Sequence, residues 1–428
     1  MNPQPNGARA QLLVLMGVLA AVLALLLSTR PAPIITVHNA GQLREIMRLG
    51  PGDIYNPFRQ LAWNNTGDAL VATTGRTSYL WRFSHNVTDT VQLDGAGRYT
   101  TRTLFLDNSP TAFLGLAPSL LLMDIESGKR LQTLENITVA SDQDWSLSAD
   151  GHRIALANES SISVINTLTG ERRSVIPVPD GYRFWYSRLT FNDDGTLLVA
   201  APQDKQCSVC ERPIRIWNAD SGEQIMVLAA LHNGIVWSFD FSSDGRILAV
   251  GGSDQTDAGD ALLQLWNLNT GEESGLFAVG GRTIEQIIIS PDNRRIAAQG
   301  LGDVWLWDVA ELLKSGASRL HLQSDGYSLN YSAIAFSPDG QLFATGSPLG
   351  EVLLFDTNTG RLIATLQGHE RRINQIAFRD DGRLLATASD DGTIRLWSLT
   401  GREVITPATE SVITLPTPIF TATPTLIP

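Results

Sequence analysis

Cysteine is almost absent from this chain, with Cys207 and Cys210 the two found among 428 residues. So few cysteines exclude a disulfide-rich scaffold and a four-cysteine zinc site. Positive charge is scarce as well, because 44 Asp and Glu outnumber 32 Lys and Arg and give a formal net charge of −12. An acidic chain without a basic stripe repels the phosphate backbone, so nucleic acid is not an expected partner.

Signatures of catalysis are missing too. The sequence contains no Gly-x-x-x-x-Gly-Lys-Ser/Thr loop, no His-Glu-x-x-His pair and no Gly-x-Ser-x-Gly elbow. The histidines are scattered, and the sequence indicates neither a metal nor a cofactor.

One long apolar run is present, from Leu12 to Leu27, with Arg9 before it and Arg30 after it. A helix of about 18 residues spans roughly 27 Å, close to the thickness of a membrane core. We therefore predict that residues 1–33 are a signal anchor, or a signal peptide if they are cleaved, followed by a short spacer. The anchor is favoured because no convincing small-x-small cleavage site follows. Either prediction places the rest of the chain outside the cytoplasm, anchored to the membrane or secreted.

Residues 368–398 contain a repeat unit. Three short apolar runs with period-two alternation are separated by Asp381-Gly382 and Asp391-Gly392. Asp-Gly supplies the positive φ that a tight hairpin needs, so the unit is predicted to be a meander of strands. Such a unit cannot bury its own faces and needs copies of itself on either side.

Related units recur along the body of the chain, marked by an aromatic or apolar residue before Asp, Asn, Ser or Arg. Successive markers lie between 41 and 52 residues apart, a period typical of propeller blades. The markers are Trp81-Arg82, Met123-Asp124, Ile165-Asn166, Trp217-Asn218, Trp266-Asn267, Trp307-Asp308, Phe355-Asp356 and Trp397-Ser398. They predict an all-β fold, an eight-bladed propeller over residues 34–407. Seven blades would remain if the irregular unit at 102–124 is a linker.

The two ends of the body are predicted to meet. Asn39-Ala40-Gly41 and the run from Gln42 to Leu49 have the form of an outer strand, yet no three-stranded unit precedes them. We expect this strand to complete the last blade and close the ring, which removes exposed sheet edges. Gly401 to Thr406 is the competing candidate for that place. Residues 408–428 are rich in Pro and Thr and are predicted to be an extended, disordered tail.

The stretch from Gly368 to Trp397 resembles a blade of the WD-repeat (WD40) family, and weaker copies fill the body of the chain. The resemblance implies a buried structural tetrad of His369, Thr387, Asp391 and Trp397. A buried indole N–H and an imidazole need partners, which a linked set supplies. Other units depart from the pattern, since Phe355 has no donor and Leu349 stands in place of the turn aspartate.

The resemblance also implies a scaffold that binds other molecules through one face of the ring, without catalysis. Aligned on the turn glycines, Trp185 and Arg372 take equivalent positions, as do Trp237 and Asn374. In the family these positions open onto the face around the central channel, so the four residues are candidates for binding a protein or peptide. The alternative is that they pack between blades.

Cys207 and Cys210 are spaced as Cys-x-x-Cys in a loop. Outside the cytoplasm they predict a disulfide across a loop tip. A redox-active pair and half of a metal site are the alternatives.

The sequence thus favours a non-catalytic, extracytoplasmic WD-repeat scaffold. The leading alternative is a propeller enzyme, resembling a quinoprotein dehydrogenase or acting on polysaccharides. Eight-bladed quinoproteins typically have adjacent cysteines, whereas Ser208 and Val209 separate the two cysteines here, which weakens that alternative.

Overall fold

The structure is a computed structural model, and it describes most of residues 33–399 together with two short segments near the C-terminus. Within the body, nineteen short segments are left out of the description. The described ranges are 33–64, 66–74, 77–84, 87–94, 100–105, 111–116, 119–124, 130–134, 145–148, 150–158, 160–167, 169–183, 189–201, 203–204, 213–231, 234–254, 260–301, 303–316, 320–323, 333–399, 406–407 and 411–413.

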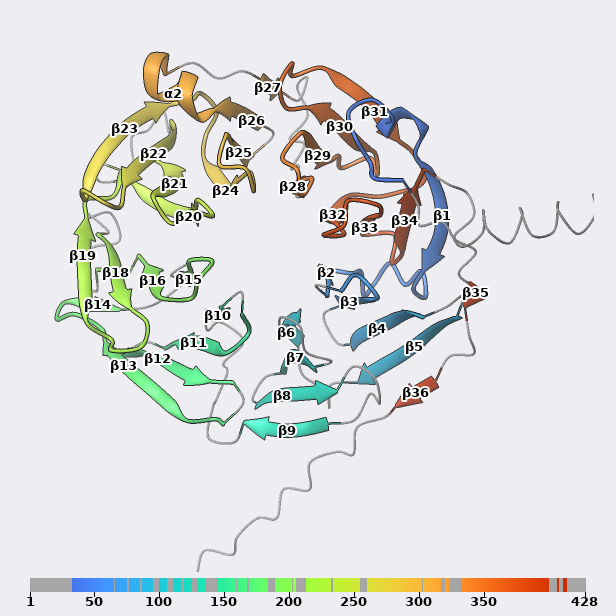
Figure 1. The fold of residues 1–428 in the computed structure, drawn as a ribbon, viewed down its shortest axis with the longest axis horizontal. Coiled ribbons are helices and arrows are strands. Elements are labelled where there is room, and N and C mark those ends of the chain that lie inside the picture. Colours follow the sequence, from blue (N-terminus) through green and yellow to red (C-terminus); the bar gives the residue numbers. More distant parts are fainter. Residues whose placement is uncertain are drawn as a thin grey trace, which may run out of the picture.

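The described residues form an all-β ring of antiparallel sheets (Figure 1). Each sheet is a meander whose first strand lies nearest the ring centre and whose last strand lies at the rim. The first four sheets in the chain comprise β2 (Gln60–Trp63), β3 (Ala69–Thr73), β4 (Thr77–Ser84) and β5 (Val87–Asp94); β6 (Thr100–Phe105), β7 (Thr111–Leu116), β8 (Ser119–Asp124) and β9 (Arg130–Leu134); β10 (Trp145–Leu147), β11 (Arg153–Ala157), β12 (Ser161–Asn166) and β13 (Arg172–Pro177); and β15 (Leu189–Phe191), β16 (Leu197–Ala200), β18 (Ile214–Asn218) and β19 (Gln224–Leu228).

The remaining sheets continue the ring in the same way. They comprise β20 (Ile235–Phe241), β21 (Ile247–Ser253), β22 (Ala261–Asn267) and β23 (Glu272–Ala278); β24 (Ile284–Ile289), β25 (Arg295–Gly300), β26 (Asp303–Asp308) and β27 (Leu320–Gln323); β28 (Ile334–Phe336), β29 (Leu342–Gly346), β30 (Val352–Asp356) and β31 (Leu362–Leu366); and β32 (Ile373–Phe378), β33 (Leu385–Ser389), β34 (Ile394–Ser398) and β1 (Arg44–Leu49). A small ribbon of β14 (Tyr182–Arg183) and β17 (Gln203–Asp204) stands beside the β15–β19 sheet.

Ring closure follows the sequence prediction. β1, from the start of the described chain, pairs antiparallel with β34 from its end, with Arg44 opposite Ser398 and Leu49 opposite Ile394. The 3-10 turn η1 (Ala40–Gln42) leads into β1. The predicted donation of an N-terminal strand to the last sheet is therefore confirmed. Thr406, the end of the competing segment, pairs with β5 instead.

The core lies between neighbouring sheets. One cluster joins Val352 and Leu354 of β30 to Ile373 and Ile376 of β32. Middle strands such as β33 are buried along their whole length, because they are covered on both faces. Small or apolar side chains therefore fill such strands.

One helix was not anticipated. α2 (Val309–Ser315) connects β26 to the segment that leads to β27. Asp308 caps its N-terminus by accepting a hydrogen bond from the Glu311 amide, and Gly316 ends it with φ 68°. This aspartate and glycine are the helix start and stop signals that the sequence carries.

Among the residues that the structure describes, no helix is long and apolar enough to cross a membrane. The predicted anchor at residues 1–33 lies outside them except for Pro33. Within the tail predicted to be disordered, Ser411–Ile413 forms strand β36, and Thr406–Pro407 just before the tail forms β35. Both pair with β5, and the other tail residues lie outside the description.

Candidate protein-binding face

The four residues of the predicted tetrad lie together in the last sheet. Trp397 Nε1 donates a hydrogen bond to Thr387 Oγ1 at 3.0 Å. The same Oγ1 lies 2.8 Å from His369 Nε2, and His369 Nδ1 lies 2.8 Å from Asp391 Oδ2. All four side chains are buried. These hydrogen bonds connect the loop before β32 to the turn between β33 and β34.

Asp391 is the charged acceptor of this hydrogen-bond network. Its carboxylate also accepts hydrogen bonds from the Thr393 amide at 2.9 Å and the Thr393 hydroxyl at 2.6 Å. Burial acts to raise the pKa of Asp391, but the hydrogen bonds from His369 and Thr393 outweigh it and hold the pKa well below its usual range. The turn is therefore fixed by a carboxylate that stays ionised.

A second polar network joins the last sheet to the loop before β2. Asn374 Nδ2 donates to Phe58 O at 2.9 Å and to Asp390 Oδ1 at 2.8 Å. Asp390 also lies within 3.6 Å of Arg59 and 3.5 Å of Arg372. Asn374 is 6% exposed, so its amide serves this joint and not the partner surface that the sequence predicted for it. Arg372 remains 32% exposed beside it.

Trp237 and Asn374 occupy equivalent places in the structure. Each is the extra residue of a β-bulge at the start of an inner strand, between Val236 and Ser238 in β20 and between Ile373 and Gln375 in β32. A bulge re-aims the residue that it inserts. The large Trp237 side chain is 44% exposed, whereas the smaller Asn374 folds into the joint.

Three other predicted residues lie outside the described part of the chain. Trp185, Cys207 and Cys210 fall within segments 184–188 and 205–212. The disulfide and the role of Trp185 therefore stay predictions.

The loops that enter inner strands and the turns between second and third strands lie at one end of the ring, because successive strands run in opposite directions. We call this end the entry face. Exposed apolar side chains gather on it: Trp237 (44%), Leu301 (38%) and Leu349 (71%) on three consecutive sheets, then Ile54 (40%) and Tyr55 (93%) in the loop before β2. We call these five residues the apolar arc. Sequence reasoning missed all but Trp237, although Leu349 stood out by replacing a turn aspartate.

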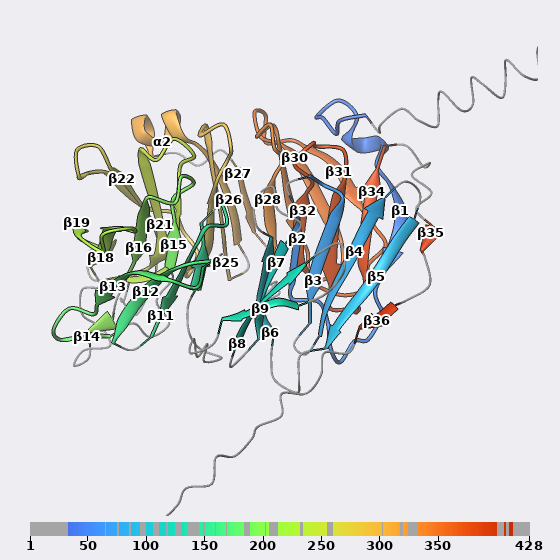
Figure 2. The ribbon, with the colours of Figure 1, turned by 60° about the horizontal axis from the view of Figure 1, so that its bottom comes forward.

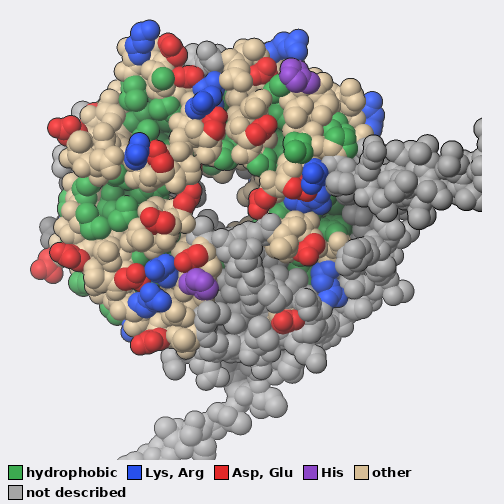
Figure 3. Space-filling view, viewed as in Figure 1, with side chains coloured by type: hydrophobic (Ala, Val, Ile, Leu, Met, Phe, Trp, Pro, Cys, Tyr) green, Lys and Arg blue, Asp and Glu red, His purple; other side chains and the backbone are tan. Residues whose placement is uncertain are grey.

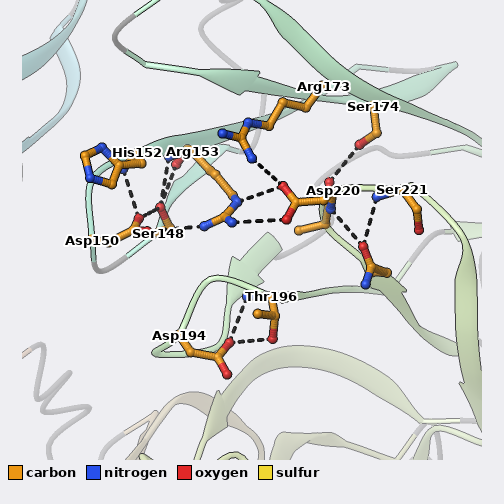
Figure 4. A network of polar contacts seen from close by, with 12 residues as sticks. Ser148, Asp150, His152, Arg153, Arg173, Ser174, Asp194, Thr196, Asp220 and Ser221 are labelled. Atoms are coloured by element: carbon orange, nitrogen blue, oxygen red, sulfur yellow. Dashed lines mark hydrogen bonds and ion pairs between the residues drawn. The ribbon is translucent and has the colours of Figure 1, made fainter.

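At the opposite end of the ring, a cluster of charges joins two neighbouring sheets. Arg153 Nε and Nη2 donate to the two carboxylate oxygens of Asp220 at 3.0 and 3.1 Å, and Arg173 Nη1 donates to Asp220 at 2.8 Å (Figure 4). Arg153 also reaches Asp150 at 3.2 Å. These pairs link the β10–β13 and β15–β19 sheets. The hydrogen bond from Arg153 lowers the pKa of Asp220 more than burial raises it.

The carboxyl of Asp240 lies between two inner strands. Asp240 of β20 accepts a hydrogen bond from the Ile289 amide of β24 at 2.7 Å. Burial raises the pKa of Asp240 to about 7, and the nearby Asp193 carboxylate adds to the rise against the effect of the Ile289 amide. A pKa near 7 is typical of a general acid. However, Ser146 accepts a hydrogen bond from the Phe191 amide at the equivalent position between another pair of sheets. The shared position assigns Asp240 to a joint between sheets.

The space-filling view down the ring axis shows an opening at the centre, with acidic side chains near its edge (Figure 3). Among the described residues, no group of three or more His, Cys, Asp or Glu is placed to hold a metal ion.

Comparison with known proteins agrees with this geometry. The model of the WD domain, G-beta repeat, matches residues 222–267, 323–356 and 360–398. A guanine nucleotide-binding protein subunit beta of Nicotiana tabacum is 27% identical over 225 residues, which is 51% of this chain and 56% of that protein. Eukaryotic translation initiation factor 3 subunit I of Lodderomyces elongisporus is 24% identical over 198 residues, 44% of this chain and 52% of that protein. The matches thus span a little over half of these relatives.

Solved structures with a similar fold include the Dos1 propeller, with a TM-score of 0.68 and 14% identity over 87% of this chain and 99% of that chain. The computationally designed Ika8 protein has a TM-score of 0.63 and 18% identity over 83% of this chain and 99% of its own. The fold defines a β-propeller. Within this propeller, the three matched segments are WD repeats.

Proposed function

We propose that this chain is a non-catalytic scaffold that binds a protein or peptide partner through the entry face. The apolar arc is the observation that carries the proposal. Leaving Trp237, Leu349 and Tyr55 in water forgoes about 25 cal/mol for each Å² of apolar surface that a partner would cover. Trp and Tyr are also the residue types that most often dominate binding energy.

Fixed charges beside the arc supply orientation. Arg59 and Arg372 are 53% and 32% exposed and are both held near Asp390. An arginine with one side committed to a carboxylate still presents N–H donors to a partner. The entry face therefore combines exposed apolar side chains with fixed charges, as recognition surfaces commonly do.

The face is also rigid where it meets the last sheet. The tetrad and the Asp390 network hold the loop before β32, the turn after β33 and the loop before β2 in one arrangement. Loops that are ordered before binding lose less conformational entropy when a partner arrives. The relatives support the same role, since the two named above are each a subunit of a larger assembly.

The scaffold in this proposal has eight blades. Its support is the set of seven four-stranded sheets and one six-stranded sheet among the described residues, each built around a first strand near the ring centre. The unit at 102–124, which could have been a linker, contributes β6, β7 and β8 to one of them.

We further propose that the propeller works outside the cytoplasm, tethered by residues 12–27, or secreted if that segment is removed. The uninterrupted apolar run supports this location. Fractionation of the native cells, with mass spectrometry of the mature N-terminus, tests it. Recovery of the protein in the cytoplasmic fraction would refute it.

Partner capture tests the binding face. Full-length protein carrying Trp237→Ala and Leu349→Ala should lose crosslinked co-purification of the partner from native membranes, with an unchanged melting temperature. Ile225→Ala with Val227→Ala is the matched control, because these residues are 50% and 47% exposed on the outer strand β19.

Equal capture by both double variants would remove the entry face from the proposal. Cofactor absorbance and hydrolase or dehydrogenase turnover should be measured on the same wild-type preparation. A robust activity there would favour the enzyme alternative instead.

A further inference from the structure

The outer strand β5 has a longer and more regular edge than the other outer strands that the structure describes. It has eight residues, against seven in β23, the next longest, and four in β27. Each outer strand of a propeller leaves one row of backbone N–H and C=O groups unpaired by its own sheet. A long, flat edge of this kind is a template for another strand.

β5 also lacks the irregularity that blunts most of the other edges. The pairing of β4 with β5 runs from Thr77–Asp94 to Ser84–Val87 without a register shift. Register shifts interrupt the outermost pairing in six other sheets, those ending in β1, β9, β13, β19, β23 and β31. A bulge bends and twists an edge, which makes it a poor template. The β26–β27 pairing is also regular, but it covers four residues.

The open edge of β5 receives the chain's own C-terminal segment. β35 (Thr406–Pro407) places Thr406 opposite Val87, and β36 (Ser411–Ile413) places Val412 opposite Gln92, both parallel to β5. Figure 2 shows the two strands outside β5 on the rim of the ring. Elsewhere in the described chain no outer strand carries a fifth strand of this kind.

This added pairing is weak by construction. β35 has two residues and β36 three, and each backbone hydrogen bond contributes about 0.5–1.5 kcal/mol net. Pro407 has no N–H to donate to a ladder. An extended segment that paired without proline along all eight residues of β5 would form more bonds than the tail does.

We propose that the edge of β5 is a strand-addition site for an extended peptide that runs parallel to it, and that Thr406–Pro407 and Ser411–Ile413 occupy this site until such a peptide displaces them. The partner is a β-forming segment of about eight residues, rich in Val, Ile and Thr and free of internal proline. This site is on the rim and is independent of the entry face.

The test uses the full chain with Val412→Pro, which removes a backbone N–H within β36. Thr421→Pro is the control, because it also removes a backbone N–H from the tail but outside the paired residues. Amides of residues 87–94 should exchange hydrogen faster in V412P than in T421P or the wild type, with an unchanged melting temperature. Equal exchange in the three proteins would overturn the proposal.

A binding measurement completes the test. The probe is a fluorescent peptide with the sequence of residues 404–415 in which Pro407 is replaced by Thr. A tethered tail competes at an effective concentration in the millimolar range, so V412P should bind the peptide at least about tenfold more tightly than T421P. Equal affinity of the two variants, or binding by neither, would show that β5 is not an acceptor. Loss of the apolar arc leaves this result unchanged, so the two proposals fail separately.

Discussion

At the scale of single residues, the last sheet depends on one ionised side chain. Asp391 receives hydrogen bonds from His369 and Thr393 inside the protein, and removal of its carboxylate would leave these donors without that acceptor. A neighbouring sheet dispenses with such a chain, since Phe355 takes the place of the tryptophan and Leu349 that of the aspartate. The tetrad therefore stabilises the last sheet, formed by β32, β33, β34 and β1, and is not repeated in the sheet before it.

Asp391→Ala should lower the free energy of unfolding by about 1–3 kcal/mol, the cost of orphaned buried donors. Urea denaturation at pH 7 measures it. Asp180→Ala, at an exposed aspartate of another turn, is the control and should change stability by less than about 0.5 kcal/mol. An unchanged midpoint for D391A would refute the structural role.

Asp240 should make stability fall as the pH rises through neutrality. Its pKa is about 7 in the folded protein and near 3.8 when unfolded, so between these values the native state holds the extra proton. Stability then decreases with pH across that window. Between pH 5 and pH 8, the free energy of unfolding of the wild type should fall by about 1 kcal/mol or more relative to that of Asp240→Asn. Parallel pH profiles for the two proteins would contradict the assignment.

At the scale of elements, sequence patterns predicted what depends on local chemistry. The marker pairs fall in third strands and most end them, as Asn267 ends β22 and Asp356 ends β30. The Asn39-Ala40-Gly41 turn likewise predicted the strand β1. β36 was missed because a Pro- and Thr-rich composition conceals a strand that forms when a partner edge is available. The joint of Asn374 was missed because register alone does not say whether a bulge residue turns inward.

β1 closes the ring, and one ion pair fastens it. Arg395 Nη1 donates to Glu45 Oε2, with Arg395 9% and Glu45 30% exposed. Glu45→Ala would leave the arginine without this partner and should lower the free energy of unfolding by about 1–2 kcal/mol, less than for a fully buried pair. Guanidinium denaturation measures the change. Glu370→Ala, at an exposed glutamate, is the control, and equal midpoints for the two variants would show that the pair does not stabilise closure.

At the scale of the whole molecule, the entry face carries the apolar arc together with the charges around Asp390. At the opposite end, charged pairs such as Arg153 with Asp220 join two neighbouring sheets. The sequence predicted a ring with one binding face, and it placed Trp237 on that face. It did not predict the other members of the arc, because exposure of a loop leucine depends on how neighbouring sheets pack.

The pairing of β1 with β34, and of β35 and β36 with β5, has a consequence for how the molecule can be attached to anything else. β35 and β36 lie at the rim outside β5, whereas Ile35, near the described start of the chain, bonds to Gly382 at the end of the ring opposite the entry face. An attachment through either end would therefore reach the ring at its rim or from that opposite end. The entry face would then stay open to whatever approaches from solution.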